Sequence, residues 1–206
     1  MRGRFRRGLA AVAALALTAP ALAAQGPDPL AKLDNTTRAL VLALEDSARA
    51  EGLPAEAVLS KAQEGVAKHA PMAAIARAVR TVFLSYREAR ATLGPKANSD
   101  ELAAGAAALQ AGIPSSALSD LRASGHGKPI TVPLVVLADL VTRGVPRDMA
   151  SHTILQLWTA GAGDADLLDL PKAVGQDILS GAAPGDALLN RARTIPLRLP
   201  PGKVPE

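Results

Sequence analysis

Three histidines are the first residues of this chain that could do acid–base chemistry or bind a metal. They are His69, His126 and His152. No two of them have a metal-ligand spacing such as His-Glu-x-x-His, and the chain has no cysteine to complete a zinc site. His69 falls at the expected end of a helix, where the helix dipole favours positive charge. We therefore interpret the histidines as structural or solvated residues, and the sequence predicts no metal site and no cofactor.

A glycine-rich segment, SGHGKP at residues 124–129, has some features of a phosphate-binding loop. It lacks the earlier glycine of that motif, has no serine or threonine after Lys128, and follows no expected strand. The favoured interpretation is a connection between two helices. It is also the loop with the most glycine for close approach to a ligand. If the protein is an enzyme, its candidate residues are therefore His126 and Lys128, together with Asp164 or Asp166.

Acidic residues cluster at Asp164, Asp166 and Asp169, and their spacing raises the question of calcium. An EF-hand loop needs Asp or Asn at its fifth position and Gly at its sixth, where this chain has Leu168 and Asp169. Acidic side chains are also expected in the first turn of any helix. We attribute the cluster to a helix start. The common serine-nucleophile motifs, Gly-x-Ser-x-Gly and Ser-x-x-Lys, are absent from the chain.

An arginine stripe runs along the longest expected helix. Its members are Arg77, Arg80, Arg87 and Arg90. In helical projection they fall within about 140°, opposite the apolar face. Such a stripe is usual for a solvated helix surface, and it would also suit an anionic partner or lipid headgroups. These four arginines are the candidate binding residues.

Helices joined by tight turns must position these side chains. Three Gly-x-Pro sequences begin at Gly52, Gly112 and Gly144, and each lies between two helical patterns. Glycine in the left-handed conformation ends a helix, and proline is favoured at the first position of the next one. The spacing predicts helices over residues 34–51, 54–68, 71–92, 98–112, 114–124, 132–143, 146–160, 164–180 and 184–193. The fold class is all-α, a single domain of about eight to nine short helices in an irregular helix-hairpin array.

The first 23 residues predict a secretory signal peptide. Four arginines precede a short apolar stretch at residues 9–17, and small residues ending at Ala23 form the expected cleavage site. The apolar stretch is interrupted by Pro20 and is too short to span a bilayer. We expect a mature protein that is periplasmic or secreted and has no transmembrane segment. In it, residues 24–33 form a flexible lead-in, residues 34–193 the helical domain, and residues 194–206 a proline-rich extended tail.

Charge and cysteine content narrow the possible partners. The chain has 23 basic and 19 acidic residues, a formal net charge of +4 and a pI near 9.8. Four of the basic residues and none of the acidic ones lie in the predicted leader, so the mature chain is balanced in charge. This balance argues against nucleic acid as a partner. The absence of cysteine excludes disulfides and a lipoprotein anchor.

The sequence resembles no family that we recognise, and it favours an exported, non-enzymatic helical module that binds a protein or peptide. Two alternatives stay open. One is an envelope enzyme that uses the glycine-rich loop around His126. The other is peripheral binding to an anionic membrane surface through the arginine stripe.

Overall fold

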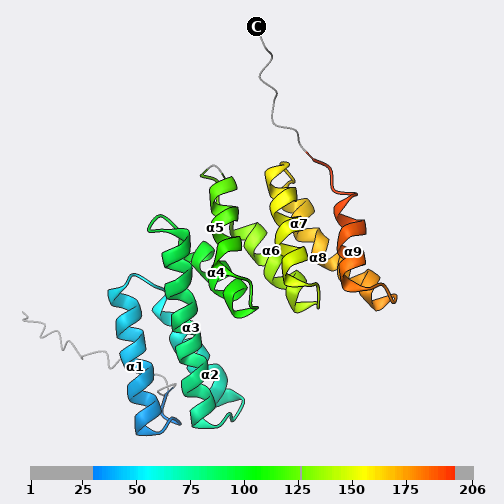
Figure 1. The fold of residues 1–206 in the computed structure, drawn as a ribbon. Coiled ribbons are helices and arrows are strands. Elements are labelled where there is room, and N and C mark those ends of the chain that lie inside the picture. Colours follow the sequence, from blue (N-terminus) through cyan, green and yellow to red (C-terminus); the bar gives the residue numbers. More distant parts are fainter. Residues whose placement is uncertain (1–29, 126, 198–206) are drawn as a thin grey trace, which may run out of the picture.

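The computed structural model describes residues 30–125 and 127–197, and its regular structure there is helical (Figure 1). The helices are α1 (Asn35–Ala50), α2 (Ala55–Ala67), α3 (Met72–Leu93), α4 (Ser99–Gln110), α5 (Ser115–Ser124), α6 (Thr131–Thr142), α7 (Arg147–Thr159), α8 (Asp164–Leu179) and α9 (Pro184–Ala192). The all-α prediction is confirmed, and each predicted helix is present. Within the described ranges the only β contact is an isolated bridge between Ala162 and Leu197. No helix in this part of the chain is both long enough and apolar enough to cross a membrane.

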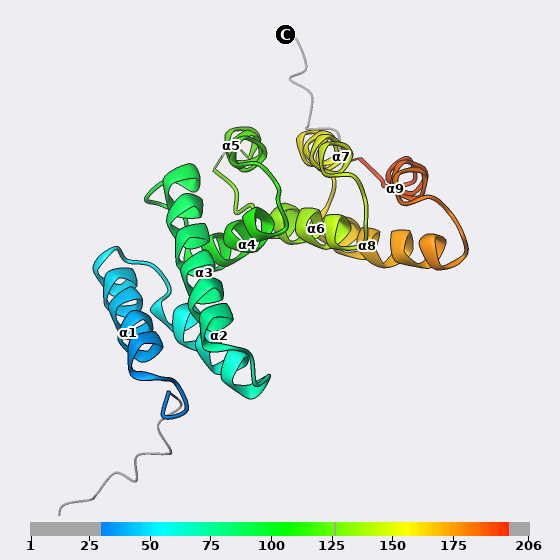
Figure 2. The ribbon, with the colours of Figure 1, turned by 60° about the horizontal axis from the view of Figure 1, so that its bottom comes forward.

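The helices form two layers (Figures 1 and 2). In one layer α4, α6 and α8 lie side by side, and in the other α3, α5, α7 and α9 follow one another. Helices α1 and α2 pack against α3 at the other end of the array. The starts of α4, α6 and α8 recur about every 32 residues, which is the length of a helix-hairpin repeat. The helices from α4 to α9 therefore repeat more regularly than the unequal spacing of the Gly-x-Pro turns indicates.

In the three Gly-x-Pro turns, the glycines adopt the left-handed conformation that the sequence predicts. Gly52 has φ +65°, its N–H donates to the carbonyl of Arg49, and the N–H of Leu53 donates to that of Ala48. These two bonds form a Schellman motif. The turns at Gly112 and Gly144 repeat it, and the residue after each of the three glycines is buried. Each turn therefore fixes its helix end with both backbone bonds and apolar packing.

The predicted position of the prolines is wrong by one residue. Pro54, Pro114 and Pro146 are N-cap residues, with extended ψ angles of 92°, 148° and 132°. Pro184, by contrast, is the first residue of α9, which is the position expected for the other three prolines. The physical reason is that the Schellman motif occupies the glycine and the buried residue after it. The proline comes next, and its extended backbone changes the direction of the chain before the following helix begins.

The core is divided into two clusters that meet along α3. One cluster contains Val41, Val58 and Val79 and binds α1 and α2 to the first half of α3. The other extends from Ala89 near the end of α3 to Leu188 in α9. At 22 residues, α3 is long enough to serve both. Residues outside the predicted domain also pack: Leu30 and Leu33 are buried in the first cluster, and Ile195 lies against the second.

Candidate functional site

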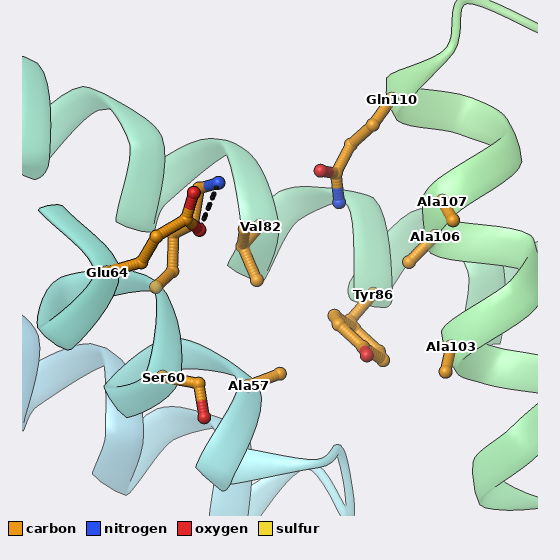
Figure 3. A pocket seen from close by; sticks show the side chains of 10 residues that line it. Ala57, Ser60, Glu64, Val82, Tyr86, Ala103, Ala106, Ala107 and Gln110 are labelled. Atoms are coloured by element: carbon orange, nitrogen blue, oxygen red, sulfur yellow. Dashed lines mark hydrogen bonds and ion pairs between the residues drawn. The ribbon is translucent and has the colours of Figure 1, made fainter. Parts of the chain in front are cut away.

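A cleft lies between α2 and α4, which both pack on α3. It has a volume of about 300 Å³ (Figure 3). One wall is a face of α2, made by Ala57, Ser60, Lys61 and Glu64, and the opposite wall is a face of α4, made by Ala103, Ala106, Ala107 and Gln110. Both sets have the i, i+3, i+4, i+7 spacing of a single helix face. The cleft is thus a groove between two helix faces.

The floor of this groove belongs to α3. Val82 and Tyr86 project into it from between the two walls (Figure 3). Tyr86 is half-buried and touches both core clusters, so it lies where the two halves of the fold meet. The α4 wall is flat, because Ala103 and Ala107 present only methyl groups and are exposed. The floor and this wall make a shallow apolar surface that is open to solvent.

Polar groups without partners surround that apolar surface. No described residue hydrogen-bonds to the hydroxyls of Ser60 or Tyr86, or to the side-chain amide of Gln110. In Figure 3 the Gln110 side chain extends from the end of α4 toward the cleft, and the Tyr86 ring lies between the walls. These groups both donate and accept hydrogen bonds and carry no charge. An apolar floor with a few convergent polar groups is the usual composition of a binding site.

Ion pairs border the cleft on the α2 side. Glu64 lies 2.8 Å from the ammonium of Lys61 and 2.5 Å from that of Lys68. Hydrogen bonds from Lys61 and Lys68 lower the pKa of the Glu64 carboxyl to about 2. Toward the start of α2 the charge is negative, and burial, with the charge of Glu56, raises the pKa of the Tyr86 hydroxyl. Within the lining of the cleft, the charges of Lys61 and Glu64 therefore balance each other, and Lys68 and Glu56 lie outside that lining.

Arg90, at the end of the predicted arginine stripe, has a structural role. Its guanidinium donates to the carbonyls of Gly52, Pro95 and Ala97 at 3.2, 3.1 and 2.9 Å. It thereby links the α1–α2 turn to the α3–α4 connection. Arg147 makes the same kind of bond to the carbonyl of Gly112, at 3.1 Å. An arginine side chain thus donates a hydrogen bond to the carbonyl of a turn glycine at two places in this fold.

The other arginines of the stripe differ from one another. Arg87 pairs with Glu51 at 2.9 Å, and its guanidinium lies 5.6 Å from the centre of the Phe83 ring. Arg77 and Arg80 are exposed, and neither has an ion pair within the described part of the chain. The structure thus leaves two arginines of the stripe available to an anionic partner. Whether the stripe binds anything stays a prediction.

The structure describes three of the four candidate residues for an enzyme. His126 lies outside the described residues, and Lys128 is in the α5–α6 connection. Asp164 and Asp166 are in the first turn of α8, as the helix-start interpretation predicts. None of these three described residues lines the α2–α4 cleft or the cavities at α4, between α5 and α7, or between α7 and α9.

The glycine-rich loop borders a larger cavity of about 470 Å³ at the start of α4. Glu101 is buried beside it and accepts from the N–H groups of Ile130 and Asn98, at 3.0 and 3.1 Å, with Arg122 at 2.8 Å. Burial raises the pKa of the Glu101 carboxyl, but the two backbone N–H groups and the Arg122 guanidinium outweigh it and leave that pKa below its usual value. With Asn98 it forms the capping box that the sequence predicts for α4. Glu101 therefore fastens the loop to α4.

A further cavity lies between α5 and α7, and its lining includes His152, Asp120 and Asp148. Across the described residues, no three histidine or carboxylate side chains are grouped so as to hold a metal ion. His69 is at the end of α2, as predicted, and has φ +53°. The predicted cleavage site at Ala23 lies outside the described residues.

Sequence reasoning missed the cleft. Its alanines, Ser60 and Gln110 have the spacing of helix faces, but the sequence does not show which faces remain uncovered. Comparisons with protein-family models, curated proteins and solved structures found no match.

Proposed function

We propose that the protein is an exported, non-enzymatic helical module that binds a protein or peptide partner in the α2–α4 cleft. The observation that carries this proposal is the cleft itself, whose apolar floor at Val82 and Tyr86 is surrounded by unpartnered polar groups. Two-layered helix arrays commonly bind partners along grooves between successive helices.

A pull-down from the envelope fraction of the source cells tests the binding site. Ala107→Phe would fill the cleft from the α4 wall, and Ala165→Phe adds the same ring at an exposed position of α8. Partners should be identified by mass spectrometry at low and moderate salt, after thermal melts show that both variants are folded. We expect a partner that Ala165→Phe retains and Ala107→Phe loses. Equal capture by both variants would contradict the proposed site.

Export rests on the predicted leader and has its own test. The mature protein should begin at Ala24, and mass spectrometry of the protein from the envelope would show this directly. Recovery of the chain from the cytoplasm with residues 1–23 still attached would contradict export, and would leave the cleft proposal unaffected.

A second candidate function is attachment to an anionic membrane surface through Arg77 and Arg80. The exposure of both guanidiniums, next to the exposed side chain of Leu84, favours it. The test is co-sedimentation with vesicles that contain anionic lipid, compared with neutral vesicles. Binding should decrease steeply with salt and be lost in the double variant Arg77→Glu/Arg80→Glu. Equal sedimentation with both kinds of vesicle would reject this candidate.

A further inference from the structure

We infer that the cavity between α5 and α7 binds a primary ammonium group at the end of a short apolar chain, with Asp120 and Asp148 as its two carboxylate partners. This inference concerns a second site and does not depend on the α2–α4 cleft. It assigns a class of ligand to a cavity that has no part in the proposed function.

The cavity is built from one face of each of two neighbouring helices, α5 and α7, which pack on each other (Figures 1 and 2). From α7 it takes residues with the i, i+3, i+4, i+7 spacing of a single helix face, which are Asp148, Ser151, His152 and Leu155. From α5 and its N-cap it takes Pro114, Ser116, Ala117 and Asp120. The volume of about 250 Å³ is at the small end of the range for ligand pockets, so it suits a small ligand or a single side chain.

The charge of this lining is negative and unbalanced. Asp120 belongs to the α5 wall and Asp148 to the α7 wall, and neither carboxylate has an ion pair within the described ranges. No lysine or arginine lines the cavity. Arg147, which is next to Asp148 in the sequence, donates to the carbonyl of Gly112 instead. Two unpaired carboxylates around one small cavity repel each other and attract a cation.

The hydroxyl of Ser151 is an independent sign of a ligand at this cavity. Its oxygen is buried and has no hydrogen-bond partner among the described residues, although Ser151 belongs to the lining. Buried polar groups in folded proteins nearly always have a partner, and a hydroxyl left without one destabilises the fold. A donor group of a ligand that enters between the two aspartates would give this oxygen its hydrogen bond.

The number and kind of acceptors favour an ammonium group over other cations. An ammonium has three N–H donors, and the cavity offers two carboxylates and one hydroxyl. A guanidinium presents its donors in a planar fork that suits one carboxylate at a time. A metal ion is disfavoured, since the described residues contain no group of three histidine or carboxylate side chains that could hold one. The apolar residues Pro114, Ala117 and Leu155 provide a surface for the methylene chain that carries the ammonium, as they would for the stem of a lysine.

The experiment is an NMR titration of the isotope-labelled protein with butylammonium chloride at low salt. We expect saturating shifts of the His152 ring signals and of the backbone signals of Ala117 and Leu155, in the millimolar range that suits two partly solvated ion pairs. The ring of His69, at the end of α2 and outside the cavity, is the internal control and should not move. Two further compounds separate charge from hydrogen bonding. Neutral 1-butanol lacks the charge and tetramethylammonium lacks the N–H donors, so neither should give saturating shifts.

Variants of the protein test the two carboxylates. Asp120→Asn and Asp148→Asn keep the shape of each side chain and remove its charge, so each should weaken the binding of butylammonium about tenfold. Asp100→Asn is the matched control, because Asp100 is an exposed aspartate in the first turn of α4, as Asp148 is in the first turn of α7. It should leave binding unchanged. Thermal melts followed by the fluorescence of Trp158 establish that each variant is folded.

Two larger compounds distinguish the possible sources of the ammonium group. Acetyl-lysine-methylamide carries it on a peptide backbone, and 1,4-diaminobutane carries it as a free amine with a second charge. Tighter binding of the lysine compound than of butylammonium would identify a lysine side chain of a protein as the source. Tighter binding of the diamine would identify a free polyamine.

Several outcomes would overturn the inference. Equal shifts with 1-butanol or tetramethylammonium would show that the cavity does not select an ammonium group, and shifts confined to other residues would place the binding elsewhere. Unchanged binding in both asparagine variants would show that the two carboxylates take no part. The comparison of the three compounds uses the natural protein, so it decides the question even where a variant does not fold. None of these results bears on the α2–α4 cleft, which the pull-down with Ala107→Phe tests separately.

Discussion

At the scale of single residues, this fold depends on a few side chains that hold turns and connections. His69 is the clearest case of strain, because it occupies the left-handed position of a Schellman motif with φ +53°. It is the only non-glycine residue of the described ranges with a positive φ. A side chain with a Cβ atom is disfavoured in that conformation, since the Cβ approaches the following carbonyl oxygen. Glycine carries no such penalty.

His69→Gly should therefore stabilise the protein, by about 1 kcal/mol in the free energy of unfolding. Urea unfolding followed by Trp158 fluorescence measures this difference. Gly52→Ala is the matched control, because Gly52 holds the same position in the α1–α2 turn and a Cβ there would meet no other atom. That variant should lose a similar amount. No change in either variant would show that these turns do not impose the left-handed conformation.

Glu101 is the residue whose loss should cost most. Its carboxylate is buried and joins the start of α4, the connection before α6 and Arg122. Glu101→Ala leaves Arg122 and two backbone N–H groups without their acceptor, and should lower the free energy of unfolding by about 3 kcal/mol. Asp100→Ala, one residue earlier and exposed, is the control and should have a small effect. A small loss for Glu101→Ala would mean that the connection is held by other contacts.

The same carboxyl gives a pH dependence with a definite sign. Its pKa in the folded protein is below the ordinary value of 4.5, so the folded state favours the ionised form. The stability it contributes is complete above pH 4.5 and is lost as the pH falls through the folded pKa. Unfolding measured at pH 6 and at pH 3 should show a smaller acid-induced loss in Glu101→Gln than in the natural protein. Other ionised carboxyls, such as Glu64, contribute equally to both and cancel in the comparison.

At the scale of elements, the helices and turns follow from local sequence, and the packing surfaces do not. The Gly-x-Pro turns and the Asn98–Glu101 capping box involve residues close in sequence. These structures can therefore be predicted without knowledge of the rest of the chain. The uncovered faces of α2 and α4 depend on where α3 holds those helices, and no local pattern encodes this. Arg90 illustrates the same limit. Its place in the stripe predicted a solvated or anion-binding side chain, whereas it bonds to the carbonyl of Gly52, 38 residues away.

Gly65 shows how closely two elements approach. A Cβ on this residue would lie 2.7 Å from Cγ1 of Ile75, whose side chain is buried with 2% exposure. Gly65→Ala gains helix propensity of about 1 kcal/mol, but the overpacking costs about 1–3 kcal/mol. We expect a net loss of stability, or at best no gain, in thermal melts. Gln63→Ala, on the exposed side of the same helix, should be neutral or stabilising. A clear gain for Gly65→Ala would show that α2 can move away from α3.

At the scale of the whole molecule, the α2–α4 cleft lies where the two core clusters adjoin. α1, α2 and the first half of α3 form one cluster, and the helices from α4 to α9 belong to the other. In helix arrays, stability is approximately the sum of local units and the interfaces between neighbours. A change in one cluster is therefore transmitted to the other mainly through α3. The proposed binding cleft has one wall from each cluster. The distance between its walls therefore depends on how α3 packs against both clusters.

Hydrogen exchange of backbone amides tests this division. Val41→Ala removes two carbon atoms from a buried side chain in the first cluster, and Val136→Ala, in α6, does the same in the second. We expect the first variant to speed exchange in α1 and α2 while α6 and α8 keep their protection, and the second to do the reverse. Equal acceleration throughout by either variant would show that the protein opens as one cooperative unit. Selective opening by Val41→Ala would also predict weaker partner binding, since it loosens the α2 wall while α4 stays in place.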